Sequence, residues 1–139
     1  MQAALLDTDA CIEIIRGNPA PVQFTPDTVF VVSIISQFEI LSGLKGQKGT
    51  KVEVRAKTFL KTADIRPFDD SAADAGAKIR IQLESAGHPI GSYDLLLAGH
   101  ALALNIPIVT GTQNEFQRVP GLKIINWRSP EYPPRSKGD

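Results

Sequence analysis

The sequence predicts a single α/β domain in which a central parallel sheet of about 4–5 strands is flanked by helices. Short apolar runs rich in β-branched residues alternate with longer segments whose apolar residues recur every three or four positions. Gly, Pro or a capping residue stands between many of these segments. Repeated strand–helix–strand units need right-handed crossovers, which put helices on both faces of a parallel sheet. The length of 139 residues fits one domain, for which we expect the range 1–128, followed by a flexible tail over 129–139.

The expected strands are short and apolar. The run from Val29 to Ile35 is typical of a strand that is buried on both faces. Pro67 interrupts another run, which therefore belongs at an edge of the sheet or ends early. The predicted strands cover residues 3–6, 29–35, 65–68, 108–110 and 122–125.

Each expected helix begins beside a residue that can cap it. Thr8 or Asp9 is the predicted cap of a helix that runs to about Arg16, and Ser36 begins a second helix through Leu44. Ser92 is the predicted cap of the last helix. The remaining helices are expected over 51–63, from the capping run 69–71 to about 87, and over 93–104.

Composition restricts the class of protein. No apolar run approaches the ~20 residues of a membrane span, so we expect no membrane partner, and the single Cys11 excludes an internal disulfide. Cytoplasm is the expected compartment, with Cys11 as a small buried residue. The net charge is zero, but one stretch is basic around Glu53. Its cations suit the phosphates of a nucleic acid or, as the pattern favours, a solvated helix face: Lys45, Lys48, Lys51, Arg55, Lys57 and Lys61.

Three acidic residues fall where the predicted topology brings chain segments together. Asp7 follows the first strand, Glu39 lies a few residues past the second, and Asp94 begins the last helix. Ligands of open α/β sheets bind outside the carboxyl ends of the strands, and carboxylates there suit Mg²⁺ or Mn²⁺. Each acid also has a structural explanation. Glu39 fits a capping box with Ser36, Asp94 can complement a helix dipole, and Asp9 can cap a helix.

Other kinds of site find little support. His88 and His100 lack partners at zinc-site spacing, and no nucleophile elbow, Walker loop or dinucleotide fingerprint is present. The acids therefore remain the best candidates for chemistry, with Asp7, Glu39 and Asp94 as metal ligands.

Four blocks in order resemble PIN-domain ribonucleases, specifically VapC-type toxins of type II toxin–antitoxin pairs: LLDTDACIE, VSIISQFEILSGL, IGSYDLLLAGHALALNIPIVT and NEFQRVPGLKIINW. The resemblance spans residues 5–127. It implies a PIN-like fold and a magnesium-dependent endoribonuclease in the cytoplasm, neutralised by a VapB-like antitoxin and usually homodimeric. It also implies metal binding by Asp7 and Asp94 and a further active-site acid at Glu39, bound to the metal directly or through water.

The sequence departs from the family pattern at two positions. Asp9 stands where the family often has Asn, and Thr112 stands where it often has Asn or Asp. Thr112 cannot supply a carboxylate, so Asp9 or Glu115 is the candidate for the missing charge. Two alternatives stay open. The D-T-D run also resembles haloacid-dehalogenase phosphatases, and the chain could be a non-catalytic RNA-binding or protein-interaction module whose acids are helix caps.

Overall fold

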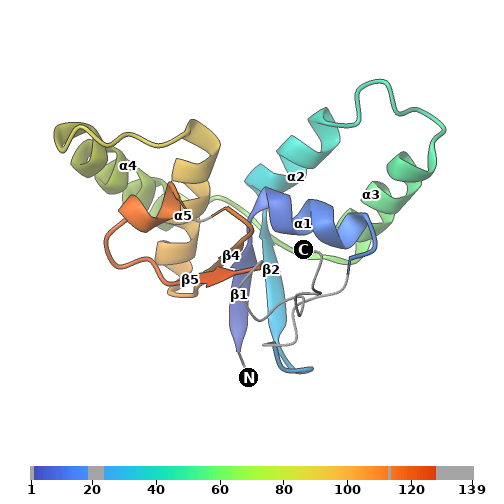
Figure 1. The fold of residues 1–139 in the computed structure, drawn as a ribbon, viewed down its shortest axis with the longest axis horizontal. Coiled ribbons are helices and arrows are strands. Elements are labelled where there is room, and N and C mark those ends of the chain that lie inside the picture. The colour runs from blue at the N-terminus through green and yellow to red at the C-terminus, as the bar shows by residue number, and fades with distance from the viewer. Residues whose placement is uncertain (1, 19–23, 113, 128–139) are drawn as a thin grey trace, which may run out of the picture.

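The computed structural model describes residues 2–18, 24–112 and 114–127, which form a five-stranded sheet with helices on both faces (Figure 1). The strands are β1 (Ala3–Leu6), β2 (Val29–Ser33), β3 (Asp64–Arg66), β4 (Ile108–Thr110) and β5 (Ile124–Asn126). The helices are α1 (Thr8–Ile15), α2 (Ile34–Ser42), α3 (Lys51–Thr62), α4 (Asp70–Ser85) and α5 (Ser92–Leu104), with the 3₁₀ turn η1 (Phe116–Arg118). These elements confirm the predicted α/β class.

All neighbouring strands are parallel, in the order β3-β2-β1-β4-β5. Leu6 lies opposite both Val32 and Val109, so β1, β2 and β4 end at the same edge. The chain proceeds from β1 to one side through β2 and β3, and then to the other side through β4 and β5. The strand order therefore reverses between β1 and β4, which is where open α/β sheets bind their ligands.

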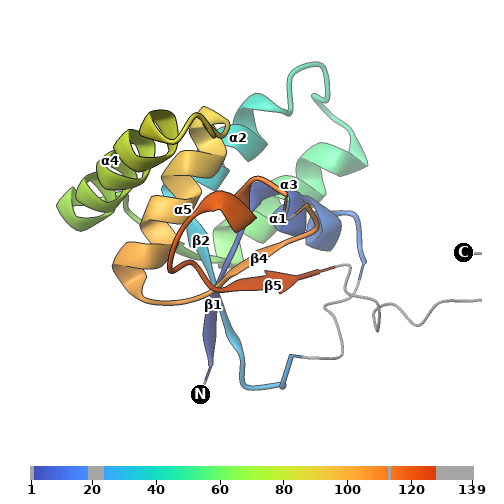
Figure 2. The same ribbon diagram turned by 60° about the vertical axis from the view of Figure 1, so that its left-hand side comes forward.

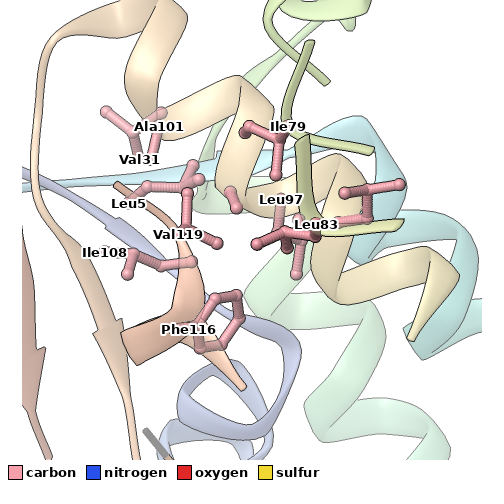
Figure 3. Packing of buried hydrophobic residues seen from close by; sticks show 11 residues of the cluster. Leu5, Val31, Ile79, Leu83, Leu97, Ala101, Ile108, Phe116 and Val119 are labelled. Carbon is pink, nitrogen blue, oxygen red and sulfur yellow. The ribbon is translucent and has the colours of Figure 1, made fainter. Parts of the chain in front are cut away.

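The two faces of the sheet bury separate apolar clusters. Leu5, Val31 and Ile108 pack toward α4 and α5, together with Phe116 of η1 (Figure 3). Alternate residues point to the other face, where Leu6 belongs to the cluster under α1 and α3. Figure 2 shows α4 and α5 lying together on one side, with α1 and α3 on the other. Burial on both faces explains why the strands read as continuous apolar runs.

Helices α4 and α5 approach closely at a pair of glycines. A Cβ atom on Gly99 would lie 2.7 Å from the Cα of Gly76, which is shorter than real Cβ contacts. A side chain at Gly99 would therefore push the helices apart, whereas a Cβ atom on Gly76 would meet nothing within 4 Å. The close contact fixes α5 against α4, and α5 carries Asp94 in its first turn.

The helix caps differ from two of the predictions. Asp7, rather than Thr8 or Asp9, caps α1, and its Oδ1 accepts a hydrogen bond from the Ala10 amide at 2.8 Å. Ser33 caps α2 by accepting from the Ile35 amide at 3.1 Å. Strand β2 therefore ends at Ser33, and α2 begins before Ser36, so the predicted start of this helix was wrong.

Three further boundaries shift. Ser92 lies inside α5, whose N-cap is Gly91, so its predicted role as the cap was wrong. Strand β3 ends at Arg66, before Pro67, because proline cannot donate a ladder hydrogen bond. This strand is at the edge of the sheet, as predicted. The last strand starts at Ile124 rather than Leu122.

The tail predicted over 129–139 lies outside the described residues. Across the ranges that the structure describes, no helix is both long enough and apolar enough to cross a membrane.

Candidate active site

Asp7 lies at the point where the strand order reverses. Its amide donates to the carbonyl of Val109 at 2.9 Å, which extends the β1–β4 pairing by one step and places the side chain at the sheet edge. The residue is only 3% exposed. A carboxylate has two oxygens, and capping α1 engages Oδ1. Asp7 thus serves as a helix cap and also lies at the edge where open α/β sheets bind ligands.

Burial perturbs the Asp7 carboxyl. The pKa of Asp7 is raised to about 6, mainly by loss of solvation and in smaller part by the charges of Asp9 and Glu39. Hydrogen bonds from the Thr110 side chain and the Ala10 amide oppose this change in pKa. The site therefore concentrates negative charge in a buried place, which a bound cation would relieve.

The pKa of Asp94 is also raised. Burial, a hydrogen bond with Glu115, and the charges of Glu115, Asp7 and Asp9 raise the pKa of Asp94 above its ordinary range. The N-terminus of a helix favours a negative charge and would lower this pKa. Burial and the neighbouring carboxylates act on the pKa of Asp94 in the opposite direction.

Glu39 comes from the second turn of α2. Its Oε1 accepts a hydrogen bond from the Thr8 hydroxyl at 2.5 Å. The capping-box interpretation, in which Glu39 bonds back to Ser36, was wrong because Ser33 is the cap of α2. Glu39 is instead joined to α1, and its charge acts on Asp7.

Glu115 supplies a fourth carboxylate beside Asp94. Besides its bond with Asp94, it accepts a hydrogen bond from the Gly91 amide at 3.2 Å, at the start of α5. Thr112 is exposed, and so is Asp9. A cleft of about 270 Å³ runs beside these two residues and is lined by Asp9, Ile12, Glu13, Arg16, Gly111 and Thr112. The described residues thus bring Asp7, Glu39, Asp94, Asp9 and Glu115 into one electrostatic neighbourhood.

The donor set fits a hard cation that keeps part of its water shell. Within the ranges that the structure describes, no three His, Cys, Asp or Glu side chains are arranged to hold one ion together. A cation such as Mg²⁺ needs only one or two direct carboxylates, since water fills the other positions. The buried Asp7 and the half-buried Asp94, each with a raised pKa, match that requirement.

The sequence did not predict the hydroxyl groups of the site. Thr8 donates to Glu39, the buried Ser36 contacts Thr8, and the buried Thr110 contacts Asp7. The only sequence signal for these contacts is that Thr8 directly follows Asp7, the acid at the end of the first strand. His100 has a structural role, because its Nδ1 lies 2.9 Å from the Ser33 hydroxyl in the interior.

The predicted RNA-binding cations are exposed. Lys45 and Lys48 lie in the loop between α2 and α3, and Lys51 is the first residue of α3. Arg55 lines an apolar groove of about 280 Å³ together with Glu39. Lys57 pairs with Glu53 at 3.5 Å, as on a solvated helix face. Both original explanations of the basic stretch remain compatible with these positions.

The PIN-domain family model matches residues 4–122. The chain belongs to the PIN-domain family. This membership opposes the haloacid-dehalogenase alternative. Nucleases of this family generally depend on divalent metal ions.

Individual relatives agree with the family assignment. The chain is 32% identical to a tRNA(fMet)-specific endonuclease VapC of Shigella flexneri and 30% identical to that of Salmonella typhimurium. Each alignment covers 88% of this chain and 96% of the relative. The fold resembles VapBC2 from Rickettsia felis bound to a promoter DNA fragment, with a TM-score of 0.80 and 28% identity over 91% of this chain and 99% of that one.

Proposed function

We propose that this protein is a magnesium-dependent endoribonuclease toxin of the VapC type. The observation that carries the proposal is the convergence of carboxylates where the strand order reverses, with the pKa of both Asp7 and Asp94 raised by burial and by their acidic neighbours. Membership of a nuclease family and the similarity to curated VapC ribonucleases support it. The cytoplasm is the compartment that suits an RNA substrate.

Each acid has a proposed role. Asp7 and Asp94 would hold the metal, and Glu39 would either bind it through water or orient the attacking water and accept its proton. Glu115 adds negative charge beside Asp94, which compensates for Thr112. Asp9 lines the cleft where substrate approaches. When bound, Mg²⁺ or Mn²⁺ lowers the pKa of water and stabilises negative charge on the phosphate.

The basic residues near the site are proposed to bind RNA phosphates without reading sequence. Lys45, Lys48, Lys51 and Arg55 are all exposed, and Arg55 lies on the groove beside Glu39. Phosphate neutralisation by such side chains is sensitive to salt. Cleavage should therefore weaken as the salt concentration rises.

A VapB-like antitoxin is the proposed protein partner, because similar solved structures are VapBC toxin–antitoxin complexes. The apolar groove between α1, α2 and α3 suits a segment with apolar side chains, and a segment bound there would cover Glu39. Co-purification with the product of a short neighbouring reading frame, and inhibition of cleavage by it, would test this partner. The homodimer that the family resemblance implies is tested by sedimentation of the isolated protein.

The decisive experiment is cleavage mapping on a mixed RNA pool with Mg²⁺, with Mn²⁺ and with EDTA. Wild-type protein should leave a 5′-phosphate and a 3′-hydroxyl in the presence of metal only. Asp7→Asn should abolish cleavage while the circular dichroism spectrum stays unchanged. A 2′,3′-cyclic phosphate product, or cleavage that survives EDTA, would contradict the proposal and favour a different chemistry. RNA binding without metal-dependent cleavage would favour the non-catalytic module.

A further inference from the structure

The side chain of Ser36 lies inside the protein and points away from its own helix. Ser36 is 0% exposed, and its hydroxyl lies 2.9 Å from the hydroxyl of Thr8, which is 28 residues earlier in the chain. A serine inside a helix often bonds the carbonyl four residues before it. Ser36 instead joins α2 to the start of α1.

The direction of this hydrogen bond follows from counting protons. The Glu39 carboxylate has no proton to give, so in the 2.5 Å contact the Thr8 hydroxyl must donate. A hydroxyl has one proton, and that of Thr8 is therefore already used. In the contact between Thr8 and Ser36, the Thr8 oxygen must then accept, and Ser36 must donate.

These contacts form an ordered chain from Ser36 through Thr8 to Glu39. Hydrogen bonds in a chain polarise one another, so donation by Ser36 makes the Thr8 hydroxyl a stronger donor. Thr8 is β-branched and therefore stiff about χ1. The remaining freedom is rotation of its hydroxyl, and an accepted hydrogen bond from Ser36 restricts that rotation.

Resting on the proposed function, we propose that Ser36 is a positioning residue that acts on Glu39 through Thr8. Ser36 has no exposed surface from which it could contact a ligand. Its role is to hold the Thr8 proton on Glu39, so that the Glu39 carboxylate keeps one orientation.

Kinetics on single variants give the first test. Ser36→Ala should lower kcat about tenfold with little change in KM, since one charge-assisted hydrogen bond loses its support. Thr8→Val, which keeps the shape and removes the hydroxyl, should lower kcat at least as much, whereas Thr8→Ser should restore most of it. Ser85→Ala is the control, because it removes an exposed serine hydroxyl at the end of α4, outside the site, and should leave kcat unchanged.

The double variant separates positioning from general packing. In the Thr8→Val background, Ser36→Ala should cause no further loss of kcat, because the intermediate hydroxyl is already gone. A full additional tenfold loss there, or an unchanged kcat in Ser36→Ala alone, would overturn the proposal.

A readout independent of catalysis comes from NMR. The Thr8 hydroxyl proton should exchange slowly in wild-type protein and become fast in Ser36→Ala. If wild-type protein cleaves no RNA, the proposed function fails, whereas a Thr8 proton that is fast in wild-type protein overturns the hydroxyl chain itself.

Discussion

Replacing Asp7 by asparagine should stabilise the metal-free protein while it abolishes activity. Burial raises the pKa of Asp7 from 3.8 to about 6, so the folded state binds its proton more tightly than the unfolded state does. The stability gained from this protonation is complete below about pH 4 and is lost as the pH rises through 6. At pH 7.5 the ionised carboxylate therefore costs folding about 3 kcal/mol relative to its protonated form.

Asparagine keeps an oxygen that can accept from the Ala10 amide, and it carries no charge. It gives up the favourable charge at the N-terminus of α1, which is worth about 0.3–1 kcal/mol. The expected net gain in the free energy of unfolding at pH 7.5 is about 1–3 kcal/mol, or a rise in Tm of several degrees. Urea unfolding in EDTA at pH 7.5 and pH 4.5 measures it, and the gain should shrink at the lower pH.

Asp74→Asn is the matched control, because Asp74 is exposed on α4 and its replacement should change the free energy of unfolding by no more than about 0.5 kcal/mol at either pH. A lower stability of Asp7→Asn than of wild-type protein at pH 7.5 in EDTA would contradict a destabilising ionised Asp7. An equal change in the free energy of unfolding at both pH values would contradict it as well.

Three further perturbations test separate parts of the structure. Glu115→Gln removes a like charge from beside Asp94 and should lower the pKa of Asp94, as followed by carboxyl NMR in EDTA; an unchanged titration would show that burial alone perturbs this group. Gly99→Val should destabilise the protein by at least 1–3 kcal/mol in urea unfolding, because its side chain would collide with Gly76, and a neutral effect would refute the close packing of α4 and α5. Lys48→Glu should weaken RNA binding and flatten its salt dependence, measured by fluorescence anisotropy at several salt concentrations, whereas unchanged affinity would favour the solvated-face explanation.

The strands were predictable because burial on both faces demands continuous apolar runs, as in β2 and β4. The caps were less predictable, since the D-T-D run offers three residues that can cap a helix. The choice depends on where β1 stops pairing: the Asp7 amide still bonds to Val109, so Asp7 keeps an extended backbone and Thr8 begins the helix. That information lies in the partner strand, 102 residues away in sequence.

The candidate acids were predictable to different degrees. Asp7 follows an obvious strand, and parallel topology alone brings it to the edge where β4 ends. The contact of Glu115 with the start of α5 joins residues that are 24 apart in sequence, and it lies just before the turn η1, which has no periodic pattern. Glu39 lies three residues after Ser36, which is the spacing of a capping box. Because Ser33 is the actual cap of α2, these two residues are free to contact Thr8 instead.

The acidic site opposes folding, and the rest of the fold must offset that cost. Asp7 lies near the charges of Asp9 and Glu39, and Asp94 lies beside Glu115. Repulsion would move Asp7 and Asp94 away from these acids if the elements that carry them were loosely packed. Asp7 is fixed because β1 lies between β2 and β4, and Asp94 is fixed because α5 packs against α4 without intervening side chains at Gly76 and Gly99. The close helix contact is therefore part of the active site's support, although it lies outside the site. Loosening it should let Asp94 move away from Glu115 and lower the pKa of Asp94 before the protein unfolds.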